Sequence, residues 1–166
     1  MYALKPISPN SLDGALAKAE RYRLLNEPTE AESICRDILE VAPASREARI
    51  SLILALTDEF ARDDKAFAAA MAEIAVLESA YDRAYYSGIA WERRAKASYD
   101  SGRLGSSGNV YDWIVKALGL FEEAERLRPE GNDDPILRWN ACLRFLERHK
   151  TVGPKAEDVK EPILSE

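Results

Sequence analysis

AESICRDILEVAP at residues 31–43 and ALGLFEEAERLRP at residues 117–129 are the two segments that decide the fold of this chain. Each begins with alanine, places further small or apolar residues four and seven positions later, and ends with proline. Spacings of three and four positions bring side chains to one face of an α-helix, and a proline prevents the helix from continuing. The two segments therefore predict equivalent amphipathic helices that stop at Pro43 and Pro129.

Helical patterns continue on both sides of these segments. Apolar residues recur with helical spacing in seven stretches, and no stretch alternates with period two for long enough to form a strand. The predicted helices cover about residues 12–25, 28–42, 45–61, 65–80, 82–99, 109–127 and 135–149. A glycine- and serine-rich stretch at 101–108 is the longest predicted loop. The candidate caps are Asn10 or Ser11, Thr29 with Glu32, Asp63-Asp64, and Asn109.

The two segments resemble the second helix of a tetratricopeptide repeat (TPR) unit, in which small residues let antiparallel helices approach closely. The helix before the first segment is similar to the first helix of the unit, with Ala15, Ala19 and Tyr22 at the matching positions. The resemblance is strong in the two segments and loose elsewhere between residues 12 and 148.

The separation of the two segments indicates where the repeat departs from the family. They lie 86 residues apart, which is two units of about 34 residues and roughly 18 more. The surplus is placed in the fifth helix and the 101–108 loop. The third unit is thus interpreted as an expanded repeat, with Gly88 and Trp91 as the small and aromatic pair of its first helix. The second unit is degenerate and keeps Ala69 and Ala72.

The resemblance implies an all-α, right-handed TPR-like solenoid of antiparallel pairs with about seven helices, the last of which caps the stack. An ordinary helical bundle is the structural alternative. The predicted organisation is an N-terminal extension at 1–11, a TPR-like helical domain at 12–149 and a flexible C-terminal tail at 150–166.

In TPR proteins the first helices of successive pairs line a concave groove that binds a peptide, and the resemblance implies such a groove here. The candidates for partner binding are Leu16, Glu20, Arg23, Glu47, Ile50, Leu54, Tyr85, Ile89, Glu92, Ile136 and Asn140. The alternative for Ile50, Leu54 and Ile89 is a purely core role.

The groove candidates depart from the cationic clamp with which many chaperone-associated TPR domains hold a C-terminal carboxylate. Leu16, Glu20, Ile50 and Leu54 predict an apolar and acidic wall, so the expected partner is a protein or peptide with an amphipathic or basic-apolar segment. The sequence thus predicts a protein–protein interaction module, such as an adaptor, scaffold or co-chaperone-like protein, and no enzyme activity.

Composition limits the other function classes. The chain has 23 Lys and Arg, 29 Asp and Glu, and a net charge of −6, which disfavours nucleic-acid binding. Its one short basic cluster, Arg93-Arg94 with Lys96, is interpreted as a solvated helix face. The sequence shows no apolar run of the about 20 residues that cross a membrane and no secretion signal, so we expect a cytoplasmic location.

Chemistry-bearing residues are few. A single histidine, His149, and two cysteines, Cys35 and Cys142, do not have the spacing of a zinc site or a nucleophilic triad. The two cysteines are predicted to be reduced core thiols, and we expect neither a metal nor a cofactor.

Two further hypotheses stay open. The first is self-association, a homo-oligomer formed through Trp139, Leu143 and Leu146 on the last helix. The second is a small helical ligand-binding protein, suggested only by the aromatic residues Tyr81, Tyr85, Tyr86, Trp91 and Tyr99.

Overall fold

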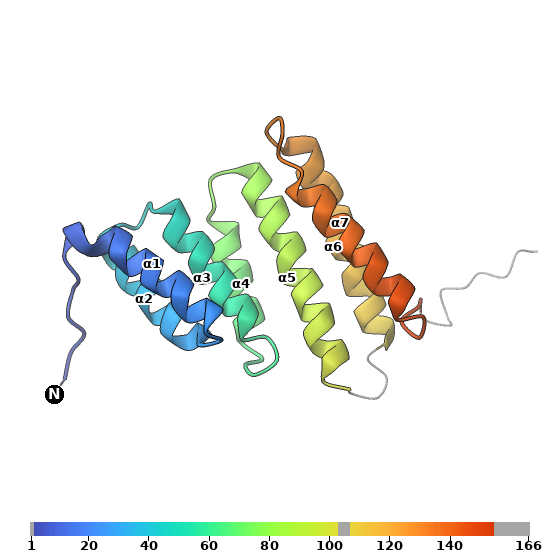
Figure 1. Cartoon of the computed structure of the whole chain (residues 1–166), viewed down its shortest axis with the longest axis horizontal. Coiled ribbons are helices and arrows are strands. Elements are labelled where there is room, and N and C mark those ends of the chain that lie inside the picture. Colours follow the sequence, from blue (N-terminus) through green and yellow to red (C-terminus); the bar gives the residue numbers. More distant parts are fainter. Residues whose placement is uncertain (1, 103–106, 155–166) are drawn as a thin grey trace, which may run out of the picture.

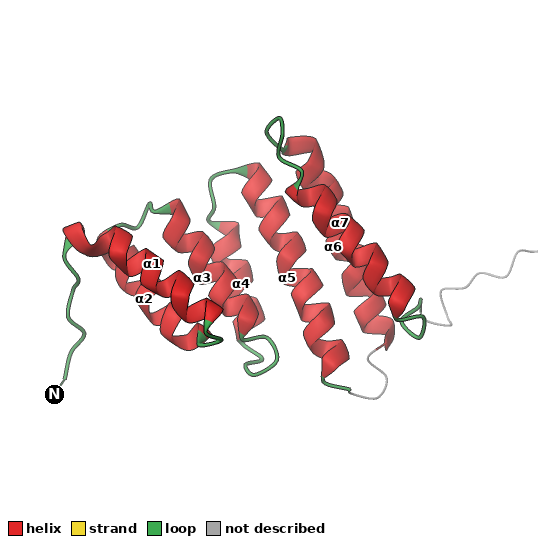
Figure 2. Ribbon diagram, viewed as in Figure 1, coloured by secondary structure: helices red, strands yellow, loops and turns green. Residues whose placement is uncertain are grey.

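The computed structural model describes residues 2–102 and 107–154, and this part of the chain is all-helical without a strand (Figure 2). The all-α class is therefore confirmed. A short 3-10 helix, η1, precedes α1. The elements are η1 Pro9–Ser11, α1 Leu12–Leu24, α2 Pro28–Val41, α3 Arg46–Asp58, α4 Ala66–Ala75, α5 Ala80–Asp100, α6 Ser107–Leu127 and α7 Asp134–Arg148. Among the described residues, no helix combines the length and the apolar character needed to cross a membrane.

The helix ends lie within two residues of the predicted boundaries except at the C-terminal ends of α3 and α4, and α3 ends at Asp58 instead of about residue 61. α4 stops at Ala75 instead of continuing to about 80, because Ser79 accepts a hydrogen bond of 3.2 Å from the backbone N–H of Asp82 and caps α5. α6 begins at Ser107, so the cap expected at Asn109 is wrong. Residues 103–106 of the predicted loop lie outside the described residues.

Two of the predicted N-terminal caps also differ. The capping box of Thr29 and Glu32 does not form, because α2 already begins at Pro28 and the Thr29 hydroxyl donates to Glu59 Oε1 at 2.7 Å. The Ser11 hydroxyl donates to the carbonyl of Ser8 and does not cap α1. Thr29 fails to cap α2 because its hydroxyl has a tertiary partner that the local sequence does not show, whereas the Ser11 hydroxyl bonds to a nearby backbone carbonyl instead.

The helices form two layers. α1, α3, α5 and α7 lie towards the viewer in Figure 1, with α2, α4 and α6 behind them. Each helix packs against the next one in the chain. In addition, α1 contacts α3, α3 contacts α5, and α5 contacts α7, so the odd-numbered helices form a continuous row.

The residues of the two deciding segments lie in the core, as their spacing predicts. Ala31, Cys35 and Ile38 of α2 are at most 2% exposed, and the matching residues Ala117, Phe121 and Ala124 of α6 are 0% exposed. Cys35 belongs to a cluster shared by α1 to α4. Phe121 belongs to a second cluster, here called the α5–α7 cluster, which includes Ile89, Val110, Ile114, Phe121, Cys142, Phe145 and Val152.

The packed part of the chain extends past the predicted domain boundary at residue 149. Val152 is 5% exposed and belongs to the α5–α7 cluster. The rest of the predicted tail, from residue 155 to 166, lies outside the described residues.

α5 and α6 approach each other closely at Gly88. A Cβ built on Gly88 would lie 2.5 Å from Cε1 and 2.7 Å from Cδ1 of the Phe121 ring, well inside van der Waals contact. The ring is fully buried and has little room to move away. Only glycine therefore permits this helix pair to pack as it does, which agrees with the small residue predicted at this position.

We predict that Gly88→Ala destabilises the fold by about 1–3 kcal/mol, because the new methyl group overpacks a filled core. Gly119→Ala is the matched control on α6, where a Cβ would meet nothing within 4 Å. The control should stabilise the protein by about 0.5–1 kcal/mol through its effect on helix propensity. Urea denaturation followed by circular dichroism measures both values, and equal midpoints for the two variants would contradict the assigned contact.

Candidate functional site

The predicted groove residues all belong to α1, α3, α5 and α7, but two of them are not accessible. Ile89 is 2% exposed and Glu92 is 0% exposed, whereas the other nine are half-buried or exposed. Ile89 packs in the α5–α7 cluster, so its role is the core one that the sequence left open. The remaining positions form part of the surface of the odd-numbered helices, which we call the odd face.

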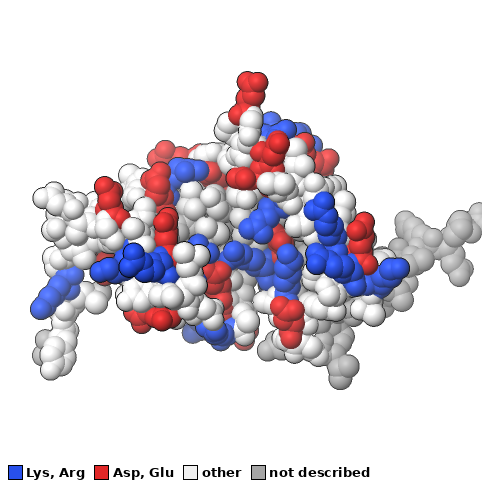
Figure 3. Space-filling view, in the orientation of Figure 1, with Lys and Arg blue, Asp and Glu red and all other residues white. Residues whose placement is uncertain are grey.

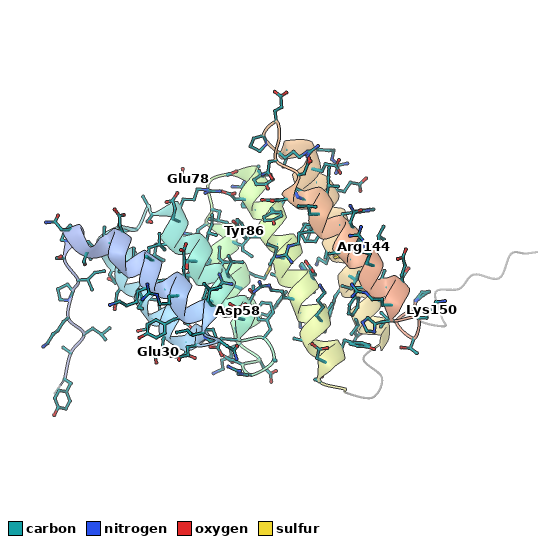
Figure 4. The ribbon with its side chains drawn as sticks, viewed as in Figure 1. Glu30, Asp58, Glu78, Tyr86, Arg144 and Lys150 are labelled. Atoms are coloured by element: carbon teal, nitrogen blue, oxygen red, sulfur yellow. The ribbon has the colours of Figure 1, made fainter. Side chains whose placement is uncertain are left out.

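One carboxylate joins three helices of the odd face. Asp58, the last residue of α3, accepts a hydrogen bond of 2.8 Å from Nε of Arg23 on α1. Its other oxygen pairs with the guanidinium of Arg93 on α5, which also donates to the Thr57 hydroxyl at 2.7 Å. Figure 4 shows Asp58 at the end of α3 that lies beside α5. The three charged side chains are 20–27% exposed, so they are held in place and still reach solvent.

A second carboxylate joins α5 to α7. The Glu92 carboxylate accepts hydrogen bonds from Lys96 Nζ at 2.6 Å and from Arg138 Nη1 at 3.5 Å. The hydroxyl of Tyr85 also lies near the Arg138 guanidinium. A buried carboxylate is strongly unfavourable without a partner, and these two cations compensate for its burial. Glu92 is thus a buried counter-ion rather than an acidic residue of a groove wall.

The ion-paired row of the odd face is locally rich in cations. Arg23, Arg93, Lys96 and Arg138 meet the two carboxylates of Asp58 and Glu92 in this row, while the exposed Glu20 and Glu47 add two negative charges to the rest of the face. Figure 3 shows Lys and Arg side chains in a band across the middle of this face, with acidic side chains mostly above and below it. Glu20, on which the expected acidic wall depends, is exposed on α1, and the acidic wall stays a prediction.

An apolar stripe runs beside the charged row. Ile50 and Leu54 lie two turns and one turn before Asp58 on α3, and both are half-buried. Ile50 and Tyr86 pack against the same buried cluster, and Leu54 packs against the α5–α7 cluster. Burial raises the pKa of Tyr86 to about 12, so its hydroxyl is uncharged at neutral pH. The odd face thus combines apolar side chains with fixed cations.

The aromatic side chains that suggested a ligand site contact other rings. Tyr81 and Tyr85 stack with centroids 5.7 Å apart, and Trp91 meets Trp113 at 6.3 Å. Tyr99 packs edge-on against Phe145 at 5.5 Å. These rings fill the space between α5 and its neighbours and do not outline a ligand pocket.

The surface suggested for self-association is smaller than expected. Trp139 and Leu146 of α7 pack against the α5–α7 cluster. Leu143 remains 39% exposed, and Leu137, which the sequence analysis did not single out, is 63% exposed.

Nucleophilic and metal-binding groups are not gathered at the odd face. Within residues 2–102 and 107–154, no group of three or more His, Cys, Asp or Glu side chains could hold a metal ion. His149 lies against the rings of Tyr99 and Phe145. Cys35 and Cys142 are free and buried, and burial raises the pKa of both thiols, that of Cys142 to about 12.

Sequence reasoning missed Asp58 and Arg138 as site residues. It interpreted Arg93 and Lys96 as part of a solvated helix face, whereas both pair with carboxylates in the structure. Asp58 continues the stripe of Ile50 and Leu54 by one further helical turn, so extending that stripe would have found it. Arg138 and Glu92 lie 46 positions apart, and no local sequence pattern indicates that they pair.

Comparison with known proteins gives no match to a family model, a curated protein or a solved structure. The functional argument therefore depends on the residues and geometry of this chain.

We predict that both thiols react slowly with a disulfide reagent at pH 8. Each is buried and largely protonated, so native rates should be at least about tenfold below those of the urea-unfolded chain. Absorbance of the released thiolate measures the rates, with Cys35→Ala and Cys142→Ala assigning each site. A thiol that reacts equally fast before and after unfolding would contradict the described burial.

We also predict that Lys96→Met and Arg138→Met each cost about 1 kcal/mol, because Glu92 keeps one cation. The double variant should lose about 3–5 kcal/mol, since a buried charge is then left unpaired. Adding Glu92→Leu to the double variant is the control and should restore most of the loss. Urea denaturation measures all four proteins, and additive losses without recovery would show that Glu92 is not held by these cations.

Proposed function

We propose that this chain is a TPR-like protein-interaction module, a right-handed solenoid of three antiparallel helix pairs and a capping helix, which binds a partner segment on its odd face. The observation that carries this proposal is the continuous row of α1, α3, α5 and α7. Each of its three junctions is spanned by an ion pair on the odd face.

The packing favours a stack over an ordinary bundle. The main contacts in the described part of the chain join helices one or two places apart, as expected when each repeat contacts only its neighbours. The equivalent segments of α2 and α6 both bury their small residues. Gly88 of α5 packs against Phe121 of α6. From the sequence, the extra residues of the third unit are assigned to α5 and to the loop that leads to α6.

The chemistry of the odd face suits protein binding. Binding surfaces are enriched in aromatic residues and arginine, and the residues that dominate their energetics lie in partly enclosed sites. The odd face offers Arg23, Arg93, Arg138 and Tyr85, all half-buried and held by neighbours, beside Leu54. Their fixed geometry lowers the entropy lost when a partner binds.

Site-specific photocrosslinking tests this proposal in the native cell. A benzophenone amino acid replaces Glu20 on α1 or Asn140 on α7, and matched controls carry it at the exposed positions Ser33 on α2 and Val115 on α6. We predict that the two odd-face positions capture the same partner protein and that the two controls do not. Capture from the controls alone, or no capture from Glu20 and Asn140, would refute binding on the odd face.

A further inference from the structure

We infer that the partner segment is acidic and apolar, with carboxylates that pair with the guanidinium groups of Arg23, Arg93 and Arg138. This inference rests on the proposed function and specifies the chemistry of the partner. It reverses the sequence-based expectation of a basic-apolar segment.

The three arginines keep N–H donors with which they can bind a partner. A guanidinium has five N–H donors. Arg23 uses Nε for Asp58, Arg93 uses Nη1 for Thr57 and Asp58, and Arg138 pairs with Glu92 and lies near the Tyr85 hydroxyl. Asp58 and Glu92 each serve two cations, so neither carboxylate can neutralise both of its partners. An incoming carboxylate can therefore form charge-assisted bonds without displacing an internal one.

Arg93 lies close enough to Arg23 and to Arg138 to be repelled by both. Burial lowers the pKa of Arg93, and the positive charges of Arg23 and Arg138 lower it further, while Asp58 acts in the opposite direction. The internal carboxylates thus leave unfavourable interactions among like charges. A carboxylate of the partner placed along this row would relieve them.

The apolar stripe of Ile50 and Leu54 is the reason that the partner segment should also carry apolar residues. Leu54 lies one helical turn from Asp58, next to the row of cations. A partner helix with acidic and apolar residues three or four positions apart would place one on the cations and the other on Leu54.

The same observations disfavour two other partners. A basic-apolar segment would bring like charge towards the arginines of the ion-paired row. Nucleic-acid binding commonly neutralises about 6–10 phosphates. The four cations of the ion-paired row are too few for this, and the chain as a whole carries a net charge of −6.

Fluorescence anisotropy of the full chain with two designed peptides tests the inference. Both peptides are labelled amphipathic helices with the same leucine positions, one with glutamate and the other with lysine at the polar positions. We expect the glutamate peptide to bind at least about tenfold more tightly, with affinity that falls as salt rises.

Charge variants connect the binding to the odd face. Arg93→Gln and Arg138→Gln should each weaken binding of the glutamate peptide about fivefold or more, because each removes a charge-assisted pair. Arg138→Lys keeps the charge and should retain most of the affinity. Arg126→Gln, at an exposed position on α6, makes the same charge change on the other layer and should have no effect. Circular dichroism confirms that each variant is folded.

The outcomes separate this inference from the proposed function. Tighter binding of the lysine peptide, lost in Leu54→Ser, would overturn the acidic partner and keep a binding role for the odd face. Equal effects of Arg93→Gln and Arg126→Gln would also overturn the inference, as would failure of both peptides to bind. A single-stranded oligonucleotide that binds more tightly than the glutamate peptide and needs Arg93 would replace the inference with nucleic-acid binding.

Discussion

The close approach of α5 to α6 at Gly88 is the constraint on which the rest of the structure depends. Because Gly88 has no side chain, the Phe121 ring lies directly against the α5 backbone. This contact fixes the rotation of α5 about its own axis. α5 then turns Ile89 into the α5–α7 cluster and Arg93 towards Asp58. A rotated α5 could not meet α3 and α7 with the same charged groups.

The ion-paired row of the odd face shows how a chain with net negative charge gathers cations locally. Two acidic residues, Asp58 and Glu92, lie among these cations. Glu92 is buried and Asp58 is shared, so each contributes one negative charge where two cations converge. The local excess thus arises from the two-to-one pairing across helices, and the overall charge gives no indication of it.

Local patterns predicted much of the fold because helix formation and core spacing are local properties. The residues of 31–43 and 117–129 that share a helix face are buried, and the small residue at Gly88 lies at a tight helix contact. Helix ends were predicted less well, since Thr29 found a partner 30 positions away instead of capping α2. The charge of the candidate site could not be predicted for the same reason. The partners of Asp58 each lie 35 positions from it, and no spacing rule connects them.

The most direct test of the central claim follows the arginine side chains themselves. Nuclear magnetic resonance resolves the Nε–H signals of individual arginines, and the glutamate peptide can be titrated into the labelled protein. The account predicts that Arg23, Arg93 and Arg138 shift together while Arg36 of α2 and Arg126 of α6 stay unchanged. Shifts confined to Arg36 and Arg126, or no shift at any arginine, would contradict a binding surface on α1, α3, α5 and α7.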